Sequence, residues 1–94
     1  MAADSSVALA IAEYVQALSS THTSRAEDRQ VIQSLAASAA ALLAEAVLGD
    51  PTAIAERAEA HERLCGHTWL QGAAVAELDR LWAEVRGLIP RAAI

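Results

Sequence analysis

A repeat of seven residues runs without a phase shift through the C-terminal half of the chain, from Ile54 to Ile89. Two positions of each repeat, separated alternately by three and four residues, fall on one helical stripe, and such a stripe packs against another helix. The stripe is mixed in its middle and apolar at its C-terminal end. It consists of Ile54, Arg57, His61, Leu64, Thr68, Gln71, Val75, Leu78, Trp82, Val85 and Ile89.

Two further helical patterns precede this repeat. The first helix is predicted to begin after a polar cap at residues 4–6, and its apolar face consists of Val7, Ile11, Tyr14, Val15 and Leu18. Six small polar side chains at 19–24 favour a loop, because they can hydrogen-bond to the nearby backbone. The second helix is predicted to start at Ser24, whose spacing to Glu27 is that of a capping box, and to run to Leu48.

The clearest break in the chain is Gly49-Asp50-Pro51. Gly suits a left-handed helix C-terminus, Asp caps the next helix, and Pro is tolerated at its first position. Because the seven-residue phase is unbroken, we predict one long helix from Asp50 to about Leu88, weakened near Gly66 and Gly72. The alternative is an interruption at 65–68, with a new helix starting at Thr68. The predicted fold is all-α: a short N-terminal helix and an antiparallel hairpin of two long helices.

Composition bears on the size of the core. The 94 residues support a single helical domain, 1–94. Apolar residues make up 54% of the chain, but nearly half of these are Ala, and Phe is absent. Ala is the best helix former but contributes little buried area. The thin core predicts that two chains pair into a homodimeric helical bundle.

Charge and cysteine content exclude several classes of function. Acidic residues outnumber basic ones by 12 to 7, and the Arg residues are scattered, so the basic stripe of a nucleic-acid-binding protein is missing. Cys65, the single cysteine, fits a reducing compartment. The N-terminus lacks the basic region of a secretory signal, and the apolar run at 35–48 is too short to span a bilayer. We therefore expect a cytoplasmic protein that binds neither nucleic acid nor membrane.

Candidate chemistry is confined to three side chains. His61 and Cys65 are four residues apart on one helix face, and His67 is nearby in sequence, so the three could be ligands of a metal-binding helical protein. A structural zinc site takes four ligands, and His67 points away from the other two on a continuous helix. A helical Cys also lacks the strained turn and oxyanion hole of a nucleophile. We expect no enzyme activity, no bound metal and no cofactor.

The remaining candidates are surfaces for protein contacts. Trp82 lies within the apolar end of the stripe, which is predicted to be core or dimer interface. Trp69 lies off the stripe, where it could anchor a partner or pack under the first helix. The predicted interface residues are Trp69, Leu78, Trp82, Val85 and Ile89.

The C-terminal end, from Gly87 to Ile94, closes the long helix with Gly-x-Ile-Pro, a basic residue and a small apolar tail. Over these few residues the chain resembles TraM-type antiactivators, small helical dimers that bind and silence transcription factors, and the resemblance implies a sequestering role. The sequence as a whole indicates a non-catalytic protein that binds and regulates another protein as an inhibitor, adaptor or sequestering factor, of phage or plasmid type. The alternatives are the metal-binding protein and a structural subunit of a larger assembly.

Overall fold

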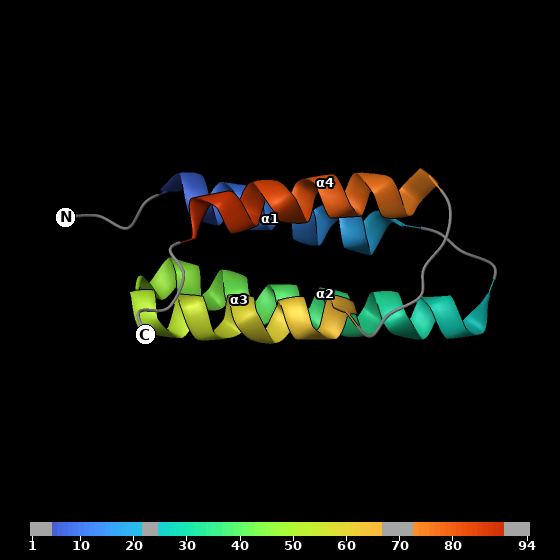
Figure 1. The fold of residues 1–94 in the computed structure, drawn as a ribbon, viewed down its shortest axis with the longest axis horizontal. Helices are drawn as coiled ribbons and strands as arrows, with labels where there is room; N and C mark the ends of the chain where they lie inside the picture. The colour runs from blue at the N-terminus through green and yellow to red at the C-terminus, as the bar shows by residue number, and fades with distance from the viewer. Residues whose placement is uncertain (1–4, 22–24, 67–72, 90–94) are drawn as a thin grey trace.

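The computed structural model describes residues 5–21, 25–66 and 73–89, and in these ranges the chain forms four helices and no strand. They are α1 (Ser5–Ser20), α2 (Ala26–Leu48), α3 (Pro51–Gly66) and α4 (Ala73–Leu88). The all-α prediction is confirmed. Figure 1 shows the helices side by side along the long axis of the molecule, with α1 and α4 in one layer and α2 and α3 in the other.

Consecutive helices run in opposite directions, so the chain passes up and down the bundle (Figure 1). The first helix packs against α2 and α4, and α2 also packs against α3. The third and fourth helices are joined by long side chains, among them His61 against Trp82 and Glu62 paired with Arg86. The start of α1, the end of α4 and the turn between α2 and α3 lie at the same end of the molecule.

The prediction of one long helix from Asp50 to about Leu88 is wrong. The structure ends α3 at Gly66 and starts α4 at Ala73, and α4 runs back along α1. The repeat face is buried along α4 and directly after it, at Leu78, Val85 and Ile89, and only in part in α3, where His61 is buried but Arg57 is exposed. An unbroken phase therefore arises without a continuous helix. The proposed cap at Thr68 lies outside the described residues.

The second helix has nearly the predicted extent. Its N-cap residue is Arg25, which is extended and makes no capping hydrogen bond through its side chain, and Ser24 lies outside the described residues. The buried face of α2 consists of Ile32, Leu35, Ala39, Leu42 and Ala46. Among the described residues, α2 alone has the length and apolar composition of a membrane-spanning helix, a test that the core helix of a soluble protein also passes.

The turn between α2 and α3 follows the predicted chemistry. Gly49 is left-handed, with φ of 83°, and its N–H donates to the Glu45 carbonyl at 2.9 Å. The Asp50 carboxylate accepts the backbone N–H groups of Thr52 at 3.0 Å and Ala53 at 3.4 Å. Both helix ends at the turn are therefore capped locally, which explains why this boundary is readable from sequence.

Gly49→Ala is expected to lower the free energy of unfolding by about 1 kcal/mol, because a Cβ is strained in the left-handed region. Gly87→Ala is the matched control. A Cβ at Gly87, in the last turn of α4, meets nothing within 4 Å, so this change should stabilise by up to about 1 kcal/mol through helix propensity. Urea unfolding of both variants measures the two effects, and changes of the same sign would contradict the assignment.

Candidate functional site: a buried polar cluster

One side chain from each helix meets at the centre of the bundle. They are Tyr14 of α1, Ser38 of α2, His61 of α3 and Trp82 of α4. We call them the four-helix cluster. His61 is fully buried and lies between the other three. A polar ring in this position must satisfy its hydrogen bonds inside the protein, because water does not reach it.

Both nitrogens of the imidazole have hydrogen-bond partners. Nε2 lies 2.7 Å from the Tyr14 hydroxyl, and Nδ1 lies 2.8 Å from the Ser38 hydroxyl. A neutral imidazole has one donor and one acceptor nitrogen, and each hydroxyl can take either role. Both tautomers are therefore fully satisfied, and the ring needs no charge.

The rings of Tyr14, His61 and Trp82 also pack against one another. The Trp82 ring lies with its centroid 4.5 Å from that of His61 and 5.4 Å from that of Tyr14. The Tyr14 and His61 rings meet edge to face at 5.3 Å. Trp82 therefore closes the cluster on the α4 side, in a geometry that favours aromatic pairs.

Burial controls ionisation throughout the cluster. It lowers the pKa of His61 from 6.5 to about 4, against a smaller opposing effect of the neighbouring Glu62 carboxylate. It also raises the pKa of Tyr14 well above its usual range, and Cys65 adds to this rise. His61 and Tyr14 are thus both neutral at physiological pH.

Cys65 lies one helical turn beyond His61 and is half-buried. Burial raises the pKa of its thiol, although a hydrogen bond with Tyr14 acts in the opposite direction. A nucleophilic Cys–His pair needs a thiolate and an imidazolium. The environment of Cys65 and His61 disfavours both ionised forms.

A second polar contact joins α3 to α4. The Arg86 guanidinium is paired with the Glu62 carboxylate, and its side chain is only 9% exposed. Its Nη1 atom is buried and has no hydrogen-bond partner among the described residues. The pair joins α3 to α4 near the end of α4, one helical turn beyond Trp82.

The predicted site residues have different outcomes. Leu78, Val85 and Ile89 are at most 6% exposed and belong to the core of a single chain, and Trp82 packs in the four-helix cluster. An interface between copies through these side chains would require α4 to leave its own bundle. Trp69 and His67 lie outside the described residues. Among the described residues, no group of three or more His, Cys, Asp or Glu side chains could hold a metal ion.

The sequence patterns do not predict Tyr14 and Ser38 as partners of His61. Tyr14 falls on the apolar face predicted for the first helix, and no pattern marks Ser38. Their separations from His61 are 47 and 23 positions, so spacing along one helix cannot reveal the contacts. The available signal was a polar residue at a packed position in each of three helices.

Comparison with protein-family descriptions, with curated proteins and with solved structures gives no match to this chain. The interpretation of its function therefore depends on the chemistry of its own surface and core.

Proposed function

We propose that this protein is a small cytoplasmic binding protein that recognises and regulates another protein, and that it acts as a homodimer without chemistry of its own. The titratable side chains of the four-helix cluster, His61 and Tyr14, are neutral and enclosed, which suits a structural role better than a catalytic one. The surface must then supply the function. One end of the bundle differs from the charged exterior of an ordinary small domain.

The observation that carries the proposal is the position of the exposed large apolar side chains. Among the described residues these are Leu9, Val47, Leu48 and Leu88, with exposed fractions of 64%, 67%, 78% and 44%. Leu9 lies near the start of α1, and the other three lie at the ends of α2 and α4. All four are therefore at the same end of the bundle (Figure 1), which we call the apolar end.

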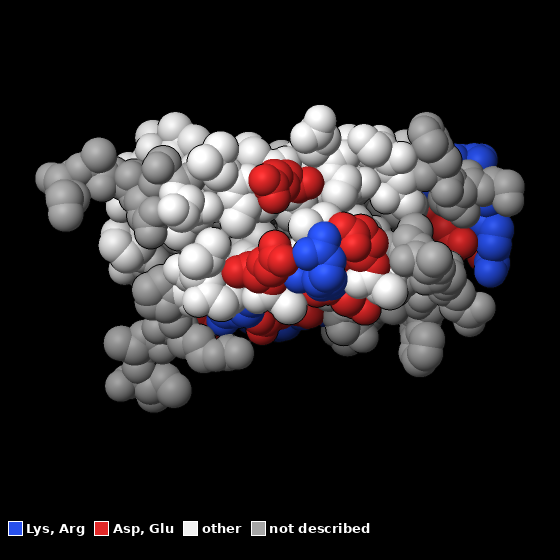
Figure 2. Space-filling model, turned by 90° about the horizontal axis from the view of Figure 1, so that it is seen from above, with Lys and Arg blue, Asp and Glu red and all other residues white. Residues whose placement is uncertain are grey.

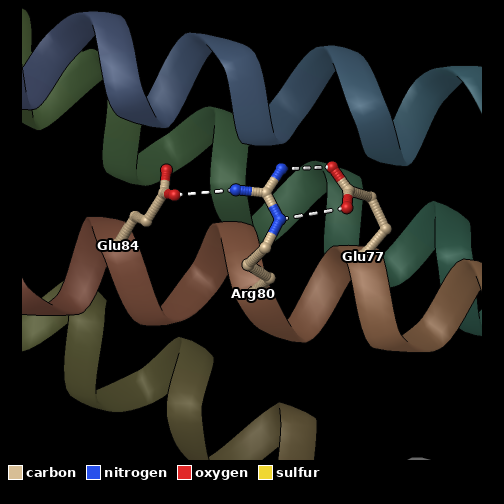
Figure 3. Close-up of polar contacts among 3 residues, drawn as sticks. All are labelled: Glu77, Arg80 and Glu84. Carbon is tan, nitrogen blue, oxygen red and sulfur yellow. Dashed lines mark hydrogen bonds and ion pairs between the residues drawn. The ribbon is translucent and has the colours of Figure 1, made fainter.

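The nearest exposed charges on the same layer, Glu13 and Glu84, lie one helical turn from Leu9 and Leu88. Figure 2 looks onto α1 and α4: one group of charged side chains lies near the middle of this face and another at its right-hand end, while the described surface toward the start of α1 is uncharged. The central charges are largely paired with one another. Arg80 lies between Glu77 and Glu84 on α4, at 2.5 Å and 2.8 Å (Figure 3).

This arrangement favours recognition of an apolar patch on a partner protein. The carboxylates of Glu77 and Glu84 already have a cationic partner, and exposed pairs of this kind contribute little to stability or affinity. A few large apolar side chains usually supply most of the energy of a protein interface. The apolar end offers Leu9 and Leu88 from the two helices of one layer and Leu48 from the other.

Replacing Leu9 and Leu88 together by Glu is expected to weaken partner binding at least tenfold, or about 1.4 kcal/mol, while helix content stays unchanged. Both side chains are exposed, so the change should cost little stability. The wild type and variant are immobilised, proteins captured from the source cells are identified, and their affinities are then measured with the purified partner.

Ala60→Glu on the exposed surface of α3 is the matched control, because it adds a carboxylate away from the apolar end. It should capture the same partner as the wild type. Equal affinity of the wild type and the Leu9/Leu88 variant for that partner would remove the apolar end from the proposal.

A further inference from the structure

The outward surface of α2 has a regular and unpartnered pattern. Exposed residues recur along it at alternating spacings of three and four, on the side opposite its buried face. They are Gln30, Gln33, Ala37, Ala40 and Ala44, and we call them the α2 face. The same spacing continues to Val47 of the apolar end, so the pattern extends over almost five helical turns.

This alternating spacing is the one at which two long helices pack side by side. No charged residue occurs at any position from 30 to 44. By contrast, the outward surfaces of α3 and α4 carry Glu56, Arg57, Glu77 and Arg80. Ala side chains let a second helix approach closely, while the Gln amides provide both donors and acceptors.

We propose that the α2 face binds the α2 face of a second copy of this chain in an antiparallel orientation. This inference rests on the homodimer included in the proposed function, and it names the surface that forms it. A two-fold axis passes between Ala37 and Ala40, so that Ala37 of one copy lies opposite Ala40 of the other. Gln33 then lies opposite Ala44, and Gln30 lies opposite Val47.

Charge favours a second copy and sets its direction. The uncharged α2 face meets itself without repulsion. Antiparallel pairing brings Arg29, near the start of α2, close to the end of α2 that carries Glu45 and Asp50, and it opposes the two helix dipoles. Parallel pairing would instead place Arg29 beside Arg29 and Glu45 beside Glu45.

A lipid surface fits the same face less well. The opposite side of α2 is packed against α1 and α3, so α2 cannot be surrounded by lipid without breaking the bundle. Gln30, Gln33 and the adjacent exposed Ser34 would also lose hydrogen bonds to water in hydrocarbon. At a helix pair, the Gln amides lie away from the axis and keep their hydrogen bonds to water at the edge of the interface.

The first test is the effect of Ala40→Glu on solution mass, measured by sedimentation equilibrium with helix content checked by circular dichroism. The wild type should have twice the chain mass at micromolar concentration, and Ala40→Glu should reduce it twofold, because two carboxylates meet at the axis. Ala60→Glu on α3 should remain dimeric. If the wild type and Ala40→Glu are both dimeric, the α2 face is wrong but the dimer stands; a monomeric wild type overturns both.

The second test distinguishes orientation and membrane binding. In a Cys65→Ala background, Ala40→Cys should be cross-linked between copies by a short bismaleimide, whereas Gln30→Cys should not, because the two Gln30 positions are roughly 25 Å apart along the helices. Cross-linking at both positions would show a parallel pair and overturn the proposal. So would flotation of wild-type protein with phosphatidylglycerol vesicles that is lost in Ala40→Glu.

Discussion

His61→Ala is expected to lower the free energy of unfolding by about 4 kcal/mol, a large part of the total stability of a domain this small. The substitution opens a cavity beside Trp82 and removes the hydrogen-bond partner of Tyr14 and of Ser38 at once. A buried hydroxyl without a partner costs about 1–3 kcal/mol. Urea unfolding followed by circular dichroism measures the change.

Ser38→Ala and Tyr14→Phe are the matched controls. Each removes one hydroxyl and leaves the aromatic packing of the cluster in place, so each should cost about 1–2 kcal/mol. If His61→Ala cost no more than either control, His61 would not be the centre of the cluster.

Acid is expected to weaken the protein by about 3 kcal/mol between pH 7 and pH 4. The folded protein holds the pKa of His61 at about 4, against 6.5 for an exposed imidazole. In this window His61 binds a proton in the unfolded chain but not in the folded chain, so the free energy of unfolding decreases as the pH falls through 6.5 toward 4. Above about pH 8 the imidazole is neutral in both states and contributes no slope.

The groups around the ring do not reverse this sign. Tyr14 and Ser38 are neutral in the window, and the Glu62 carboxylate raises the pKa of His61 by less than burial lowers it. His61→Gln keeps a side chain that can hydrogen-bond but does not titrate. Unfolding curves at several pH values should show a smaller acid slope in this variant, and equal slopes would assign the acid effect to other groups.

The parts of the fold that could be read from sequence are those set by local chemistry. The turn at Gly49 and Asp50 depends on a left-handed glycine and a capping carboxylate, and both signals lie within a few residues. The extents of α1 and α2 follow from apolar spacing in the same way. The polar residues at 19–24 predict a loop, but the first two of them belong to α1, which continues to Ser20.

The reversal between α3 and α4 could not be read in this way. Phase reports which side of a helix is buried, and α3 and α4 bury the same side against one interior. Trp82 and His61 share a stripe in the sequence, and in the fold their rings pack at a tilt of 49° from two antiparallel helices. His61, Leu78, Val85 and Ile89 of the stripe are buried inside the single chain, whereas Arg57 is exposed.

The candidate site was visible only in part. His61 was recognised as a packed residue of the stripe, yet its environment depends on Tyr14 and Ser38, which come from other helices. The apolar end was equally hidden, because Leu9, Leu48 and Leu88 become neighbours only when the chain has passed up and down the bundle.

The up-and-down connection has a consequence for the order of folding. Contacts of α1 with α2 and of α2 with α3 join neighbouring segments, and they form at low cost in chain entropy. Docking of α4 on α1 brings together the two ends of the chain, and only then does Trp82 cover Tyr14 and His61. A chain truncated before α4 would leave Tyr14 and His61 without the Trp82 ring that packs on them, so the first three helices alone would not close the interior.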